Sequence, residues 1–146
     1  MTDPYESLRL DRRVCVPLYL CSKEITRKYT PLLKALDLTY TQYIVMMYLW
    51  EHKKACVSDI GKVLLLDSGT LTPILKKLEA KGYVTRTRST LDERNLDIRL
   101  TDKGLALRDR ALSVHVAMAN CVSLTPQEAM QLLTLIGKIL NHIEKE

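Results

Sequence analysis

The chain has 146 residues, a formal net charge of +5 at neutral pH and 47% hydrophobic residues. This length suits one compact domain, and the balance of apolar and charged residues is that of a folded globular protein and not of a disordered one. The modest positive charge allows a nucleic-acid partner without requiring one. Because the chain has no Phe, an RNA-binding sheet that stacks bases on Phe side chains is not expected.

Four cysteines stand at positions 15, 21, 56 and 121. The N-terminus lacks the apolar segment of a signal peptide, and no run of about 18 apolar residues could span a membrane. We therefore expect a cytoplasmic protein in a reducing compartment, where structural disulfides are rare. Because there is no C-x-x-C pair and the histidines are scattered, we expect no metal site and no cofactor. The simplest interpretation of two or three of the cysteines is that they are small buried hydrophobic residues.

The spacing of apolar residues predicts a mainly helical chain with one β-hairpin. In chain order, the expected elements are helices over 5–36, 41–52, 57–63 and 68–81, strands over 83–89 and 96–100, a helix over 102–120 and a last helix after Thr125. Pro17 and Pro31 are expected to kink or break the first helix, because proline removes a backbone hydrogen bond. The predicted N-caps of the other helices include Thr39 with Gln42 as a capping box, Ser58, Thr101, and Thr125 with Glu128.

A helix, a short turn, a second helix and a basic hairpin follow one another in the order of a winged helix-turn-helix. On a helical wheel of residues 68–81, the leucines and Ile74 fall on one side, which predicts the core face. The opposite side is small, polar and cationic, as a helix in a DNA major groove requires. The candidate DNA-binding residues of this segment are Asp67, Ser68, Thr70, Thr72, Pro73, Lys76 and Lys77. Whether the helix starts at Ser68 or Thr70 decides whether Pro73 costs a hydrogen bond, and the sequence leaves this open.

The predicted hairpin carries four further candidates for DNA contact: Arg86, Arg88, Asp92 and Arg94. Strand alternation places Arg86 and Arg88 on one face of the hairpin. Arg94 at the tip suits a narrow minor groove, and the neighbouring carboxylates could orient its guanidinium through a bidentate pair. The alternative for the basic residues is a solvated surface with no partner. Their combination with the cationic helix favours binding to double-stranded DNA.

Two motifs resemble those of the MarR family of bacterial transcription regulators. The segment Asp67-Ser68-Gly69-Thr70-Leu71-Thr72-Pro73 is similar to that family's recognition helix, and Asp92-Glu93-Arg94 with Leu100-Thr101 and Gly104 is similar to its wing. The resemblance covers nearly the whole chain and implies a homodimer that binds operator DNA. The members of this family are mostly repressors. It implies one unit over 1–146, with a winged-helix lobe at 39–101 and dimerisation helices at 5–36 and 102–146.

The N-terminal third resembles the organic-hydroperoxide-sensing branch of that family, the OhrR subfamily. The segments that carry this resemblance are Cys15-Val16-Pro17-Leu18-Tyr19, Tyr29-Thr30-Pro31-Leu32-Leu33, Leu38-Thr39-Tyr40-Thr41-Gln42-Tyr43 and Leu49-Trp50-Glu51. The resemblance implies that Cys15 is the peroxide sensor and that Tyr29 and Tyr40 approach it from the other subunit. Tyr19 stands four residues after Cys15, on the same helix face, and is expected to line the same pocket.

The chemistry of such a sensor requires a thiolate, which attacks a peroxide and is oxidised to a sulfenic acid. Tyrosine hydroxyls that donate hydrogen bonds to the sulfur would favour the thiolate. A helical Cys15–Cys21 disulfide would require unwinding, because six residues of helix separate the two by about 9 Å. The family resemblance implies Cys121 of the partner subunit as the resolving thiol, in the predicted hinge before the last helix. A low-molecular-weight thiol is the alternative.

Two other functions remain as alternatives. One is a MarR-type repressor controlled by reversible binding of a phenolic or similar ligand. The other is a thiol peroxidase, for which the sequence has neither a phosphate-binding glycine loop nor a close His–Cys pair nor a C-x-x-C motif. We therefore expect a redox-sensing regulator that releases operator DNA on oxidation by organic hydroperoxide, and not an enzyme.

Overall fold

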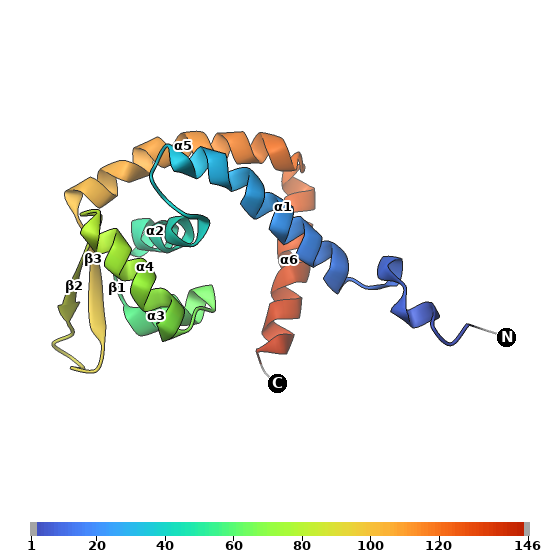
Figure 1. Cartoon of the computed structure of the whole chain (residues 1–146), viewed down its shortest axis with the longest axis horizontal. Helices are drawn as coiled ribbons and strands as arrows, with labels where there is room; N and C mark the ends of the chain where they lie inside the picture. The colour runs from blue at the N-terminus through green and yellow to red at the C-terminus, as the bar shows by residue number, and fades with distance from the viewer. Residues whose placement is uncertain (1–2, 145–146) are drawn as a thin grey trace. The chain divides into compact units, whose positions relative to one another are not determined.

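A computed structural model describes residues 3–144 of the chain (Figure 1). The chain divides into two compact units, Met1–Val114 and His115–Glu146. The elements in chain order are two 3-10 turns, Glu6–Leu8 and Leu10–Arg12, then α1 (Cys15–Lys34), α2 (Tyr40–His52), β1 (Lys54–Cys56), α3 (Val57–Leu64), α4 (Ser68–Ala80), β2 (Val84–Arg88), β3 (Leu96–Leu100), α5 (Asp102–Val122) and α6 (Pro126–Ile143). The ends of the expected ranges 1–146 and 102–146 lie outside the described residues.

The first helix is shorter than the sequence pattern predicts, since α1 begins at Cys15 and not near residue 5. Pro17 explains the difference. An α-helix that continued upstream would need a bond from residue 17 to the carbonyl of residue 13, and proline lacks the N–H and clashes with that carbonyl. At the third position of α1, where backbone N–H groups have no helical partner, Pro17 costs little. Pro31 lies inside α1 without ending it.

The predicted N-caps are confirmed for three helices. At α2, Thr39 accepts from the backbone of Gln42 and the Gln42 side chain returns to the Thr39 N–H, forming a capping box. Thr125 and Glu128 form the same arrangement at α6, and Thr101 Oγ1 accepts from the Gly104 N–H at α5 at 3.0 Å. Each such cap satisfies backbone donors that the helix itself leaves unpaired.

The prediction of Ser58 as the N-cap of the third helix is wrong. The N-cap of α3 is Cys56, with no side-chain hydrogen bond. The reason lies in β1, a three-residue strand that pairs antiparallel with β3, from Lys54 opposite Arg99 to Cys56 opposite Asp97. The backbone therefore stays extended up to Cys56, and the helix starts at the next residue.

The predicted hairpin is confirmed as β2 paired antiparallel with β3, with Arg86 opposite Ile98. The three strands have the order β1-β3-β2. The sequence analysis missed β1, because a three-residue strand is too short to show alternation. A small sheet beside a helix-turn-helix of α3 and α4 is a winged helix, and the expected fold class, mainly α with a β-hairpin wing, is confirmed (Figure 1).

The core of the first unit lies between α2, α3, α4 and the sheet. Its fully buried side chains include Leu33, Val45, Met46, Leu49, Ile60, Leu71, Leu75, Leu78, Val84 and Ile98. Burying each of these side chains contributes about 1.5–3 kcal/mol. Trp50 Nε1 donates to the Gly104 carbonyl at 2.9 Å and so ties α2 to the start of α5. A Cβ at Gly104 would stand 2.0 Å from the Tyr83 carbonyl oxygen, so this contact requires glycine.

The second unit contains the end of α5 and the whole of α6. Large apolar side chains of α6 are exposed, with Met130, Leu133 and Ile143 each more than 60% exposed. Within residues 3–144, no helix has the length and apolar character that a membrane span requires.

Candidate functional site

The predicted recognition helix, α4, starts at Ser68, with Asp67 as its N-cap. Asp67 Oδ1 accepts from the Thr70 N–H at 2.8 Å, and Oδ2 accepts from Thr70 Oγ1 at 3.0 Å. These bonds lower the pKa of Asp67, first through the backbone N–H and then through the hydroxyl of Thr70. Asp67 and Thr70, both predicted to bind DNA, are thus engaged with each other at the helix start, while Ser68 is exposed beside them.

The two faces of α4 match the helical wheel. Its buried residues are Leu71, Leu75 and Leu78, and Ile74 packs against the core from a half-buried position. On the opposite face Pro73, Lys76 and Lys77 are exposed, and Thr72 is half-buried. Because the helix starts at Ser68, Pro73 lies inside it and removes one backbone hydrogen bond. A cationic, exposed helix face with neighbouring N-terminal N–H groups can contact DNA phosphates.

The two strand arginines of the wing have different surroundings. Arg86 Nε donates to Glu79 Oε2 of α4 at 2.7 Å, and the Arg86 backbone N–H donates to Glu79 Oε1 at 3.2 Å. The hydrogen bond from Arg86 holds the pKa of Glu79 below its usual value. Arg86 therefore fixes the wing to the recognition helix, a pairing that the sequence analysis did not foresee. The Arg88 side chain is exposed and has no partner within residues 3–144.

Asp92 bonds to the backbone at the tip of the wing and not to a guanidinium. Its Oδ1 accepts from the backbone N–H of Arg94 at 3.0 Å, and its Oδ2 accepts from the Asn95 side chain at 3.3 Å. A short acid at the start of a turn commonly bonds to the backbone two residues on. The expected bidentate pair between a neighbouring carboxylate and the Arg94 guanidinium does not form, and the Arg94 side chain is exposed with no partner within residues 3–144.

A buried carboxylate, absent from the sequence predictions, joins the three strands. The Asp97 side chain on β3 is 9% exposed, and its Oδ2 lies 2.7 Å from Lys54 Nζ of β1. Asp97 Oδ1 accepts from the Cys56 thiol at 3.4 Å. Hydrogen bonds from Lys54, then from Cys56 and Ser89, lower the pKa of Asp97. An alternating pattern alone would have placed this acid on either face of a two-stranded hairpin, and only β1 explains its burial.

The predicted sensor residues lie along α1 and at the start of α2. Cys15 is the first residue of α1 and is exposed, and Tyr19, one turn later, is 66% exposed. Tyr29 of α1 packs against Tyr40, the first residue of α2, with 5.0 Å between ring centroids. Burial raises the pKa of Tyr29, with smaller contributions from Tyr43 and Tyr40. Tyr29 therefore stays a neutral phenol, able to donate a hydrogen bond, through the physiological pH range.

Within one subunit Cys15 is remote from the tyrosine pair. At a helical rise of about 1.5 Å per residue, Cys15 and Tyr29 are about 21 Å apart along α1. The Tyr29–Tyr40 pair can reach the Cys15 sulfur only if another copy of the chain supplies it.

The other cysteines differ from their predicted surroundings. Cys21 is exposed on α1 and not packed in a core. Cys121 lies in the last turn of α5, exposed, and not in a hinge between helices. Cys56 is half-buried, and its hydrogen bond to Asp97, together with burial, raises the pKa of its thiol. Cys56 is therefore poorly suited to react as a thiolate.

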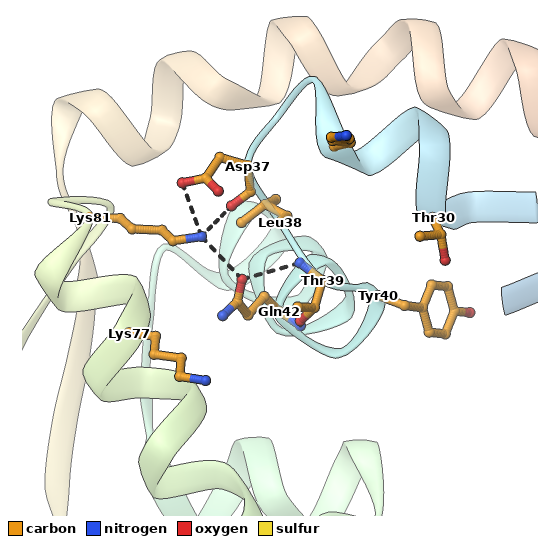
Figure 2. A pocket seen from close by; sticks show the side chains of 9 residues that line it. Thr30, Asp37, Leu38, Thr39, Tyr40, Gln42, Lys77 and Lys81 are labelled. Carbon is orange, nitrogen blue, oxygen red and sulfur yellow. Dashed lines mark hydrogen bonds and ion pairs between the residues drawn. The ribbon is translucent and has the colours of Figure 1, made fainter. Parts of the chain in front are cut away.

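A cavity of about 520 Å³ opens between α1, the α1–α2 junction, the start of α2 and α4 (Figure 2). Its walls hold three lysines, one from α1, one from α4 and one directly after α4, and the phenol of Tyr40. The lining residues are Thr30, Lys34, Asp37, Leu38, Thr39, Tyr40, Gln42, Lys77 and Lys81. Binding pockets for small molecules commonly have volumes of about 300–1,000 Å³, so this one is large enough for such a ligand.

Comparison with known proteins identifies the family. The family model of the SarA/Rot transcriptional regulators matches residues 27–110. The chain is 36% identical over 146 residues to the organic hydroperoxide resistance transcriptional regulator of Bacillus subtilis, covering 100% of this chain and 99% of that protein. It is 43% identical over 140 residues to the HTH-type transcriptional regulator SarZ of Staphylococcus aureus, covering 96% of this chain and 93% of that protein.

Solved structures of one further relative agree. AbfR of Staphylococcus epidermidis matches with a TM-score of 0.79 at 34% identity over 97% of both chains. Structures of overoxidised and of reduced AbfR bound to DNA each match with a TM-score of 0.78 at 35% identity, over 97% of this chain and 99% of the other. A disulfide form of AbfR gives a TM-score of 0.66 at 36% identity, over 92% and 95% of the two chains. The chain therefore belongs to the MarR-type winged-helix transcriptional regulators of the SarA/Rot and organic-hydroperoxide-regulator group, and is a DNA-binding protein, not an enzyme such as a thiol peroxidase.

Proposed function

We propose that this regulator is a homodimeric redox sensor that releases operator DNA when organic hydroperoxide oxidises Cys15. The observation that carries the proposal is the position of the Tyr29–Tyr40 pair, preassembled at 5.0 Å but about 21 Å along α1 from the sensor of its own chain. In a two-fold dimer, the partner subunit's tyrosine pair would meet Cys15, and each sensor would be completed across the interface.

The chemistry balances with one hydroperoxide per thiol. The Cys15 thiolate attacks one oxygen of the peroxide, an S–O bond forms as the O–O bond breaks, and the other oxygen leaves as an alcohol after taking up a proton. The sulfur is oxidised to a sulfenic acid while the peroxide is reduced. A second thiol then attacks the sulfenic sulfur, displaces water and forms a disulfide. Cys121 of the partner subunit and a low-molecular-weight thiol are the two candidates, and the exposure of Cys121 leaves it accessible.

The surroundings of the sensor support an organic oxidant. Val14 and Tyr19 flank Cys15 and are exposed, so they offer apolar area to a lipophilic peroxide. Cys15 is the first residue of α1, and the positive end of the helix dipole favours a negatively charged sulfur there. Oxidation removes the thiolate that the tyrosines contact, and the loss of these contacts would shift the lobes and lower DNA affinity. The redox forms of AbfR, a relative that binds DNA, are consistent with this chemistry.

The test is an operator-binding titration with and without cumene hydroperoxide, with non-reducing gels on the same samples. Cys15→Ser should bind the operator as tightly as the unaltered chain and should no longer be released by peroxide. Cys21→Ser, on the same helix, is the matched control and should respond fully. Cys121→Ser should lose any intersubunit disulfide, which separates the two candidates for the second thiol. Release of Cys15→Ser by peroxide would refute the assignment of the sensor.

The cavity beside α4 favours a second candidate, a regulator controlled by reversible binding of a phenolic or similar ligand (Figure 2). Its lysines would attract a phenolate or carboxylate, and its contact with α4 would transmit binding to the recognition helix. Release of DNA by salicylate with no change in the number of free thiols would support this candidate. Release that requires Cys15 would support the redox mechanism.

A further inference from the structure

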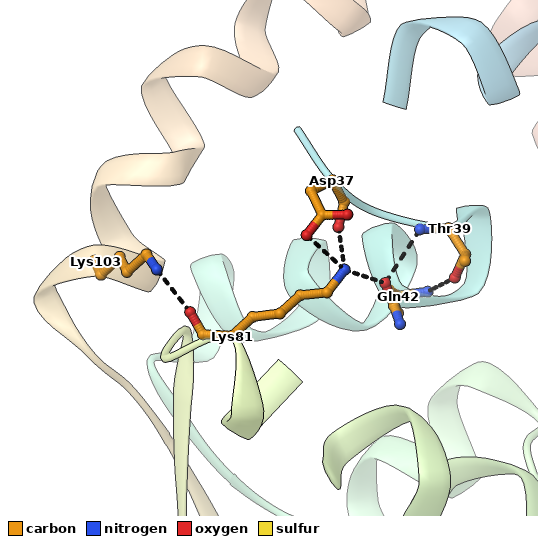
Figure 3. Close-up of polar contacts among 5 residues, drawn as sticks. All are labelled: Asp37, Thr39, Gln42, Lys81 and Lys103. Atoms are coloured by element: carbon orange, nitrogen blue, oxygen red, sulfur yellow. Dashed lines mark hydrogen bonds and ion pairs between the residues drawn. The ribbon is translucent and has the colours of Figure 1, made fainter. Parts of the chain in front are cut away.

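Lys81, the residue that follows α4, has its ammonium group surrounded by oxygens of the α1–α2 junction (Figure 3). Lys81 Nζ donates to the backbone carbonyl of Asp37, lies 3.1 Å from Asp37 Oδ2, and reaches Gln42 Oε1 at 3.5 Å. Its side chain is 26% exposed, although lysine side chains are usually solvated. An ammonium group has three donors, and here each has an oxygen on a different group. The end of the recognition helix is therefore fastened to the junction.

The junction held in this way is the turn that carries Tyr40. Asp37 has a positive φ of 54°, in the left-handed region, and its neighbours Leu36 and Leu38 are buried. Gln42 Oε1, the third oxygen near Lys81, also accepts from the Thr39 N–H in the capping box that starts α2. Tyr40 follows Thr39 directly in the chain, and its ring packs against the ring of Tyr29. A displacement of Tyr40 that moves the cap therefore moves Gln42 Oε1, one of the three oxygens around Lys81.

Lys81 also has a second attachment, on its backbone. Lys103 Nζ of α5 donates to the Lys81 carbonyl at 2.8 Å (Figure 3). The same Nζ also lies over the Tyr83 ring. The Lys81 N–H still bonds to the Lys77 carbonyl in the last turn of α4. The residue is thus fixed to α4 and α5 by its main chain and to the α1–α2 junction by its side chain.

We propose that Lys81 is a positioning residue that couples the tyrosine-bearing α1–α2 junction to the recognition helix. The proposal rests on the proposed function in one respect: oxidation of Cys15 is the event that moves Tyr40, and Lys81 passes this movement on to α4. Coupling requires a contact that differs between two states, and it acts in both directions. Movement of the junction therefore changes the position of α4, and DNA bound to α4 changes how well the junction is ordered.

The first measurement is the ratio of operator affinities of the reduced and the peroxide-treated protein. Lys81→Met removes the ammonium group and keeps an apolar stem, and we expect the ratio to fall about five-fold or more, the lower end of typical couplings. Lys81→Arg can reach the same oxygens and should retain the ratio. Lys28→Met removes one charge from an exposed lysine with no partner within residues 3–144, and controls for electrostatics. Where peroxide releases the unaltered protein from DNA, a ratio for Lys81→Met equal to that of Lys28→Met overturns the proposal.

The second measurement does not depend on redox sensing. Binding of operator DNA to the reduced protein should slow amide hydrogen exchange at Thr39 and Gln42, and this protection should be lost in Lys81→Met and kept in Lys81→Arg. If DNA is not released by peroxide but the protection depends on Lys81, the proposed function fails and the coupling stands. If the protection is absent, or is the same in Lys81→Met, the coupling is refuted even where release by peroxide is intact.

Discussion

Asp97 is a buried residue whose contacts link the strands of the wing. It receives bonds from Lys54 and Cys56 of β1, and through Ser89 it reaches the point where β2 ends. The buried hydroxyl of Ser89 in turn accepts from the Leu91 N–H at the wing tip. A single carboxylate therefore fixes the loop end of the hairpin strands, and its charged form is the one that the strands stabilise.

This network predicts a pH dependence. The pKa of Asp97 is lowered by folding, so its contribution to stability is complete above the ordinary aspartate value of about 3.9 and is lost as pH falls through the lowered value. The unaltered chain should be more stable than Asp97→Asn at neutral pH, and the difference should shrink toward pH 3 in urea unfolding. Asp109→Asn, an exposed carboxylate of α5, should differ little from the unaltered chain throughout. A constant difference for Asp97→Asn would contradict this role.

Among the elements, α4 combines a rigid frame with an open face. The Asp67 cap holds its start, Glu79 ties it to Arg86 of the wing, and Lys81 holds its end. These attachments leave Lys76 exposed on the face away from the core. Arg86 holds α4 to the wing, whereas Arg88 and Arg94 are exposed.

Lys76 should therefore act through phosphate contact. Lys76→Met should weaken operator binding for every sequence alike and reduce the slope of log K against log salt by about one. Fluorescence anisotropy over a salt series measures this slope. Lys28→Met, which removes the same charge far from α4 along the chain, should leave the slope unchanged, and an equal change in both variants would argue against a contact at Lys76.

For the whole molecule, the exposed apolar face of α6 is the feature that a monomer does not explain. Met130, Leu133 and Leu140 follow helical spacing, and a Cβ placed on Gly137 between them would meet no atom within 4 Å. Contiguous exposed apolar surface of this kind usually marks an interface. A dimer through α6 agrees with the proposed sensor, which needs two copies of the chain.

Leu133→Glu should break this interface, because an unpaired charge would be buried in it. Sedimentation equilibrium should give a dimer for the unaltered chain and a concentration-dependent monomer for the variant, which should also bind its operator weakly. Gln131→Glu adds the same charge on another side of α6 and should remain dimeric. A dimeric Leu133→Glu would place the interface elsewhere.

The sequence by itself determined the helices, their caps at Thr39, Thr101 and Thr125, the hairpin and the family, because these depend on local spacing and on motifs. The tertiary structure decided what depends on contacts between distant residues. Examples are the pairing of β1 with β3, the burial of Asp97, the Arg86–Glu79 pair and the fastening of Lys81 to Asp37. The start of α1 depends on a local rule and not on distant contacts. Pro17 prevents the helix from continuing upstream, and apolar periodicity alone does not show this. The periodicity of a sequence does not reveal which charged surface side chains pair with each other. Only the folded chain therefore shows which of them have no partner in the chain and could contact DNA.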